Sequence, residues 1–196
     1  MDYLKIFREP ASQIQKRIEQ AIEWYKKLTS GVFSKNTGPP QEQSRQFMSY
    51  PTTVEQTGGN LFVFTYYAKW GHTLPYWDRR PLVFPIGPSL RHPGNFIGLN
   101  VHYLPPQQRA ALFNGMRSEF QTGILARYYR MVVSYDKMVA NPSNFPGFDQ
   151  CIKEYIPGNI SASERIDPRY WEHVVMLPSN PDTGPNWVIN RGSPPY

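Results

Sequence analysis

Apolar positions recur at helical spacing near the start of the chain. Ile14, Ile18, Ile22 and Tyr25 follow one another at spacings of 4, 4 and 3 residues, which places them on one face of a helix. The charged residues of this segment lie at other positions, namely Lys16, Arg17, Glu19, Glu23, Lys26 and Lys27. The sequence therefore predicts an amphipathic helix over 11–29. Its narrow apolar stripe is a candidate assembly face, which packs either on its own domain or on a neighbouring subunit.

Residues 34–60 contain few apolar side chains and many Pro, Gly, Gln, Ser and Thr residues. This composition is typical of a linker or an extended arm. So little apolar surface does not offset the entropy of ordering the backbone. We therefore expect 1–60 to form an N-terminal helix and extended arm that is mobile in the isolated protein. Contacts with other subunits would order this region.

From Leu61 onward, short runs of β-branched and aromatic residues alternate with turn residues, as in a chain of short strands. Gly98 has no side chain, so another chain could approach it closely, and we add it to the candidate assembly face. Gly98 and His102 both lie on the polar face of the strand predicted over 96–103, and we expect His102 to have a hydrogen-bonded structural role. The predicted strands are 61–67, 81–86, 96–103 and 174–177, with a last short strand over 187–189.

Between the third and fourth strands, the pattern changes to a helical excursion over 105–166. A helix begins at Pro106, a second runs over 124–139, and a short one covers 150–155. Asp167 is a good N-cap for one further turn. The predicted fold is α+β: a small antiparallel β-sheet or partly open β-barrel with peripheral helices and an extended N-terminal arm. Residues 61–196 would form its β-rich core domain.

Composition excludes several classes of protein. The 20 prolines exclude a continuous helical bundle, and 15% aromatic residues exclude global disorder. A single cysteine excludes a disulfide framework. The chain has no apolar run long enough to span a membrane and no signal-peptide pattern at its start, so we expect an intracellular protein without a membrane partner. The net charge of +6 favours an acidic partner such as nucleic acid.

No sequence motif indicates catalysis. The chain lacks GxGxxG, GxxxxGK[ST], HExxH and GxSxG motifs, and its four histidines are not at metal-ligand spacing. The acidic residues are scattered, whereas a two-metal nuclease usually needs clustered carboxylates. We therefore expect no enzymatic activity, no cofactor and no metal. A small nuclease remains a third alternative, which requires acidic residues to converge in the fold.

The most distinctive segment lies between the first two predicted strands, over 74–81. One interpretation is a recognition loop, in which arginines bind phosphates and an aromatic ring stacks on a base. In the other, the aspartate caps a turn, an arginine pairs with it and the aromatics cover the core. Helix arginines could extend a basic face, or simply be solvated. The candidate residues for nucleic-acid or partner binding are Tyr76, Trp77, Asp78, Arg79, Arg80, Arg109, Arg117, Arg127 and Arg130.

Several segments together resemble a known family. These are LPYWD at 74–78, PLVFPI at 81–86 and FIGLNVHYLPP at 96–106, followed by IDPRYWE at 166–172. The pattern is similar to small virion proteins of T4-like contractile-tailed phages that are labelled DNA end protector proteins.

The resemblance implies a non-enzymatic structural component of the particle. Such a protein is made in the host cytoplasm and built into the virion at the packaged DNA end or the head–tail region. Its partners would be other virion proteins, in multiple copies, and the end of the packaged double-stranded DNA. The alternative is a tail, baseplate or neck assembly protein that contacts only other virion proteins.

Overall fold

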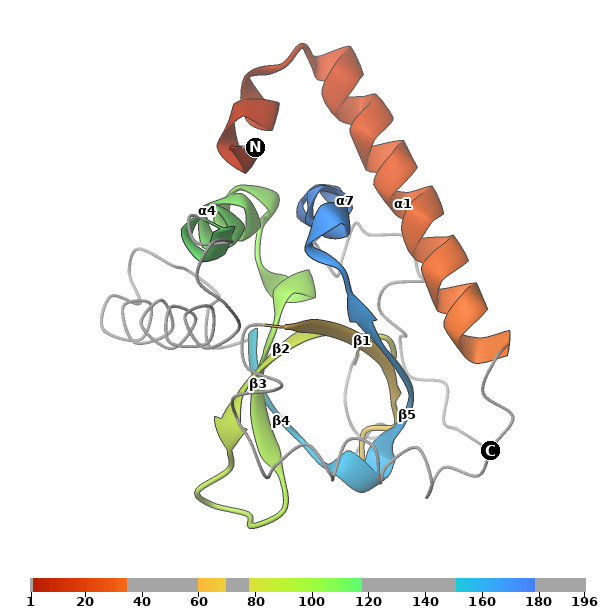
Figure 1. Cartoon of the computed structure of the whole chain (residues 1–196), viewed down its shortest axis with the longest axis vertical. Coiled ribbons are helices and arrows are strands. Elements are labelled where there is room, and N and C mark those ends of the chain that lie inside the picture. Colours follow the sequence, from red (N-terminus) through yellow and green to blue (C-terminus); the bar gives the residue numbers. More distant parts are fainter. Residues whose placement is uncertain (1, 35–59, 70–77, 118–150, 179–196) are drawn as a thin grey trace.

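The computed structural model of the chain describes residues 2–34, 60–69, 78–117 and 151–178. Five antiparallel strands form one sheet in the order β4-β3-β2-β1-β5. The two edge strands follow each other in sequence, joined only by a short 3-10 turn over Pro157–Asn159. The strands curve around one another in Figure 1, which gives a partly open barrel. They are β1 (Leu61–Tyr66), β2 (Leu82–Pro88), β3 (Phe96–Asn100), β4 (Ile152–Tyr155) and β5 (Ile160–Ile166).

The longer helices lie on one side of this sheet, as Figure 1 shows. Helix α1 packs on α7 and β5, while the N-terminal 3-10 turn η1 packs on α4. The predicted α+β class with an antiparallel sheet is confirmed. The helical elements are η1 (Tyr3–Arg8), α1 (Ala11–Ser34), η4 (Val101–Tyr103), α4 (Pro106–Arg117), η7 (Pro168–Tyr170) and α7 (Trp171–Met176).

Both faces of the sheet are buried, so the protein has two apolar clusters. On β1, Leu61 and Val63 belong to the larger cluster, which includes side chains of α1, α4 and α7. Phe62 and Phe64 belong to the smaller cluster, together with Tyr155 of β4. Alternate side chains of a strand point to opposite faces. The smaller cluster therefore fills the inside of the curved sheet, and the larger one lies under the helices.

The predicted helix over 11–29 is confirmed and extends to Ser34. Its stripe packs on the chain's own core. Ala21 and Tyr25 are fully buried, and Ile14 and Ile18 pack against the larger cluster. The sequence predicts that other subunits order residues 1–60, but α1 packs on α7 and β5 of the same chain. Residues 35–59, the expected arm, lie outside the described residues, and the division at residue 60 stays a prediction.

Two predicted elements have the wrong type. Of the strand predicted over 174–177, residues 174–176 belong to helix α7, which ends before Leu177, because Trp171, Val174 and Val175 are all buried at helical spacing between α1 and α4. Residues 152–155, which fall in the segment predicted as a short helix over 150–155, form strand β4 and pair with β3 through Phe96 and Tyr155. Tertiary packing overrode the local propensity in both cases.

The helical excursion over 105–166 is wrong in its last part, which contains β4 and β5. A bulge hid β5 from sequence reasoning: Val63 pairs with Glu164 and Thr65 pairs with Ser161, so two β5 residues oppose one residue of β1. Ala162 in this bulge has a φ of 48°. The bulge breaks the two-residue alternation, because Ile160 belongs to the smaller cluster and Ile166 to the larger one.

The remaining elements agree more closely with expectation. Strand β3 ends at Asn100, where its side chain accepts a bond from His102 N and a 3-10 turn begins, so the predicted strand over 96–103 is too long. The helix from Pro106 and the turn capped by Asp167 are confirmed. The helix predicted over 124–139 and the strand predicted over 187–189 lie outside the described residues.

Candidate nucleic-acid interface

A buried aspartate organises the start of β2. The Asp78 side chain is 3% exposed. Its Oδ1 accepts a hydrogen bond from the backbone N–H of Arg80 at 3.0 Å. Its Oδ2 accepts from Asn100 Nδ2 at 3.1 Å and lies 2.6 Å from His102 Nδ1. One carboxylate therefore ties the turn over 78–80 to the end of β3, as the capping interpretation predicts.

Helix α1 adds a second tether to the same turn. The buried hydroxyl of Tyr25 donates to the backbone carbonyl of Arg80. Its ring meets the His102 ring edge to face, with centroids 5.2 Å apart. Burial, and then the charge of Asp78, raise the pKa of Tyr25 well above its ordinary value, so the phenol keeps its proton and stays a donor. The backbone of Arg79 and Arg80 is thus held by α1 and β3 together.

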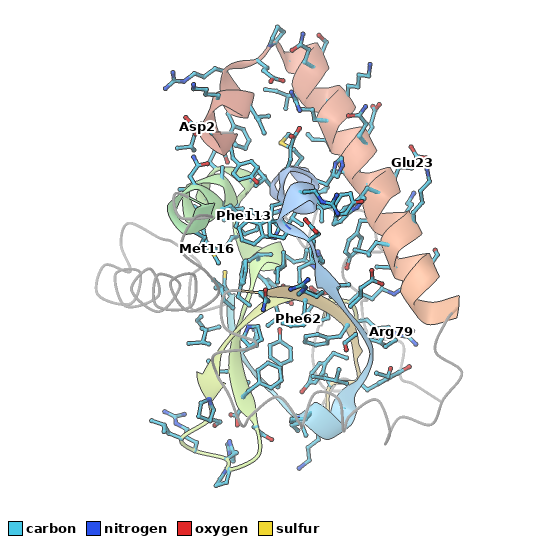
Figure 2. All side chains as sticks on the ribbon, viewed as in Figure 1. Asp2, Glu23, Phe62, Arg79, Phe113 and Met116 are labelled. Carbon is cyan, nitrogen blue, oxygen red and sulfur yellow. The ribbon has the colours of Figure 1, made fainter. Side chains whose placement is uncertain are left out.

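The side chains that this turn presents are basic and reach solvent. Arg79 is exposed, and its guanidinium lies 5.6 Å from the centroid of the Tyr67 ring, which is itself 43% exposed. In the view of Figure 2, Arg79 lies between β5 and the last turn of α1. Arg80 is half-buried; burial first, and then the nearby charge of Arg79, lower its pKa, while Tyr25 and Tyr67 oppose this shift.

We define the Arg79 surface as Tyr67, Lys69, Arg79 and Arg80. Lys69 follows the end of β1 and is exposed. The backbone N–H of Tyr66 donates to the carbonyl of Arg79 at 2.9 Å, which places the end of β1 beside the basic turn. Cations next to an aromatic ring on a fixed backbone can bind phosphate oxygens and stack against a base or sugar.

Arg109, by contrast, has a structural role. Its side chain is fully buried in α4, and its Nε donates to the Leu104 carbonyl at 2.7 Å. Its Nη1 donates to the Val174 carbonyl at 2.5 Å, at the end of α7. Burial lowers its pKa to about 9, so it remains charged at neutral pH. The expected exposed basic face that includes Arg109 is therefore wrong, because this arginine links α4 to α7 inside the core.

The other expected binding residues fall outside the structure's description. Tyr76, Trp77, Arg127 and Arg130 lie in undescribed segments, as does the side chain of Arg117 at the end of α4.

The expected role of Gly98 in assembly does not fit its surroundings. A Cβ at this position would lie 3.1 Å from Tyr155 Cε2 and closer still to Val83 Cγ1. Side chains of the chain itself thus make the close approach. Of the apolar stripe on α1, Ile22 is half-buried, and the other three members pack in the core.

A second aromatic group lies where α1 meets α7. Trp24 stacks on His173, with centroids 5.3 Å apart, and on Tyr170, with centroids 5.9 Å apart. Tyr170 is 44% exposed. Burial lowers the pKa of His173, and the neighbouring Glu172 opposes that shift. Sequence reasoning missed this group because its partners are far apart in the chain.

Sequence reasoning also missed Tyr67, Lys69 and Asn100. The even spacing of Asn100 and His102 was a signal for shared polar contacts, but nothing in the sequence indicates that Asp78 is their partner. Within the described residues, no group of three His, Cys, Asp or Glu side chains is placed to hold a metal ion. Among the same residues, no helix is sufficiently long and apolar to cross a membrane.

Comparison with known proteins gives one family match. The family described as Phage T4 terminal DNA protecting protein matches residues 43–183, which is most of the chain. This match confirms the resemblance drawn from the segments at 74–106 and 166–172. No curated protein and no solved structure matches the chain.

Proposed function

Because the chain belongs to the family of Phage T4 terminal DNA protecting proteins, we propose that it binds the ends of duplex DNA and shields them from nucleases through the Arg79 surface. The family match carries this proposal. The Arg79 surface supports it, since Arg79 and Arg80 directly follow the segment at 74–78 in the sequence, and that segment resembles the family. Such a surface offers cations and an exposed aromatic ring.

Protection of an end requires contacts that do not depend on base sequence. Contacts to phosphates supply such binding, and they position a protein on the duplex without reading its bases. Arg79 and Lys69 are exposed cations on this surface, and Tyr67 offers part of an aromatic face. The bonds from Asp78, Asn100 and Tyr25 hold the turn in one conformation, so less entropy is lost on binding.

The proposed mode of action is steric and non-enzymatic. A protein that covers the terminal phosphodiesters denies a nuclease the space it needs, and no bond has to be made or broken. In the infected cell, the protein would act on phage DNA in the host cytoplasm and then remain in the virion. We place it there as a structural component at the packaged DNA end or the head–tail region of a contractile-tailed particle. Several copies would contact other virion proteins.

The second candidate function is a tail, baseplate or neck assembly protein that contacts only virion proteins. Exposed apolar side chains outside the Arg79 surface favour it, namely Leu4 at 41%, Tyr170 at 44% and Leu90 at 97% exposure. Under this alternative, the protein binds DNA only as any basic protein does. Substitutions in the Arg79 surface then have no specific effect on its affinity for DNA.

The test compares the double variant Arg79→Ala/Arg80→Ala with a control that removes two exposed cations elsewhere, Lys5→Ala/Arg8→Ala. Both variants lose two positive charges. We expect the first to require at least tenfold more protein to protect a linear duplex from an exonuclease. We also expect the slope of log affinity against log salt to fall by up to about 2, because each phosphate contact contributes about 0.9. Equal protection by the two variants would show that the Arg79 surface is not the DNA interface.

A further inference from the structure

The hairpin that joins β2 to β3 carries an unusual residue at its tip. Leu90 is 97% exposed, whereas the other exposed large apolar side chains in the described residues are between 41% and 44% exposed. Figure 1 shows this hairpin extending beyond the curved sheet, away from the helices. An aliphatic side chain held almost entirely in water gains free energy when another surface covers it.

The hairpin is held in one shape by hydrogen bonds. The backbone N–H of Ser89 donates to the carbonyl of Asn95 at 2.9 Å, and the Asn95 N–H donates to the carbonyl of His92 at 3.1 Å. The Ser89 hydroxyl accepts from the N–H groups of Arg91 and His92. Gly94 has a φ of 92°, which suits glycine in such a turn. Leu90 thus projects from an ordered turn.

Glu154 of β4 anchors this turn to the sheet. Its Oε1 lies 2.8 Å from Nδ1 of His92 and accepts from Nδ2 of Asn95, also at 2.8 Å. The hydrogen bonds from Asn95, Ser89 and His92 lower the pKa of Glu154, so this carboxylate stays charged and bonded. Arg91, next to Leu90, is exposed and forms no ion pair within the described part of the chain. The tip therefore combines an apolar side chain with an unneutralised cation.

We propose that Leu90 lies against the outer face of the terminal base pair of a duplex, while Arg91 contacts a phosphate beside it. This inference rests on the proposed function and identifies what makes the protein select an end. Phosphates are present along the whole duplex, so the Arg79 surface alone cannot distinguish an end from the interior. The open apolar face of the last base pair exists only at an end.

The energetic argument favours an end over an internal step. Proteins that insert leucine or another apolar wedge between base steps must first unstack those bases, which costs free energy. At a terminus the outer face of the last pair is already unstacked, so an apolar side chain can cover it without that cost. A rigid hairpin adds little ordering entropy to the step.

The experiment measures end preference directly. It uses a linear blunt-ended duplex and a duplex of the same sequence closed at both ends by hairpin loops, and compares the affinity of the full chain for each. Leu90→Ser removes the apolar tip, and Leu90→Met retains it. The matched control is Leu4→Ser, at another exposed leucine. Arg79→Ala/Arg80→Ala tests the phosphate contacts, and it lies at the opposite end of β2 from Leu90.

We expect the wild-type protein to prefer the open-ended duplex, and Leu90→Ser to lose about tenfold of that preference. Its affinity for the closed duplex should be unchanged, Leu90→Met should resemble the wild type, and Arg79→Ala/Arg80→Ala should weaken both complexes. The inference is overturned if Leu90→Ser keeps the preference or weakens both complexes equally. If Leu90→Ser keeps the preference for open ends but is not incorporated into particles, the inference is overturned as well. The hairpin would then bind a protein partner. A wild-type protein that does not bind DNA overturns the proposed function and this inference together.

Discussion

The Oδ2 oxygen of Asp78 lies 2.6 Å from Nδ1 of His102, and the two side chains are only 3% and 1% exposed. A carboxylate can only accept hydrogen bonds, so Nδ1 of His102 carries the proton in this contact. The pair links Asp78, at the start of the basic turn, to His102 in the 3-10 turn η4, 24 positions later in the chain. Removing either partner would leave the other buried without its bond.

The first prediction concerns this carboxylate. Asp78→Ala removes the buried carboxylate that bonds to the His102 ring, the Asn100 amide and the backbone N–H of Arg80. These three groups are then left without that partner. We expect the free energy of unfolding to fall by about 3 kcal/mol or more. Asp167→Ala is the matched control, because Asp167 also accepts from a backbone N–H two residues ahead, but in an exposed turn. Urea unfolding should show a much smaller loss for the control, and equal losses would contradict the argument.

The second prediction concerns the close packing at Gly98. A methyl group there would collide with Val83 and the Tyr155 ring inside the curved sheet. We expect Gly98→Ala to lower the free energy of unfolding by about 1–3 kcal/mol, the usual cost of overpacking. Gly115→Ala serves as the control, since nothing lies within 4 Å of a Cβ at this helical position. That variant should gain up to about 1 kcal/mol, because alanine is the better helix former. Thermal unfolding of both variants measures the contrast.

The third prediction concerns pH. Burial lowers the pKa of His173 below its ordinary value of 6.5, so the unfolded chain takes up this proton at a higher pH than the folded protein does. The contribution of His173 to stability is therefore present above pH 6.5 and is lost as the pH falls through the folded pKa. We expect the urea midpoint of the wild type to drop between pH 7.5 and pH 5.

His173→Gln isolates this effect from that of the other histidines. It should be less stable at every pH, because it loses the stack on Trp24, but its midpoint should fall less on acidification. Parallel pH profiles for the two proteins would show that His173 does not titrate differently in the folded and unfolded states.

The fourth prediction concerns the N-terminal helix. The burial of Ala21 and Tyr25 against the core indicates that a chain beginning near residue 59 exposes apolar surface on α7 and β5. We expect that chain to be aggregated or poorly folded, whereas the sequence predicts a mobile region over 1–60 and a separate core domain over 61–196. Ala21→Glu should destabilise the full chain strongly, whereas Gln20→Glu at the exposed neighbouring position should not. A shortened chain with native near-ultraviolet circular dichroism and cooperative unfolding would show instead that residues 61–196 fold independently.

Local patterns were sufficient for several elements. The 4, 4 and 3 spacing of apolar residues predicted α1, and the aromatic and β-branched runs predicted β1 and β2. Asp167 before Pro168 predicted the turn that follows it. These signals work because each depends on residues within a turn or a strand of one another, so the local chain contains the whole cause.

Part of the candidate site could also be predicted from the sequence. Asp78 followed by two arginines indicated a capped turn with basic side chains, and the structure places Arg79 in solvent beside Tyr67. The net charge of +6 favoured an acidic partner, and the lack of catalytic motifs in the sequence predicted a non-enzymatic protein. The family segments then indicated a DNA end, which neither charge nor spacing could do.

What only the tertiary structure decided depends on partners that are distant in the sequence. Val174 and Val175 favour a strand locally, but packing between α1 and α4 makes their segment a helix. Arg109 is an ordinary helix cation in sequence, and only the carbonyl of Val174, 65 residues away, makes it a buried link. The free energy of these contacts comes from burial and from hydrogen bonds formed away from water, and neither exists until the elements have packed together.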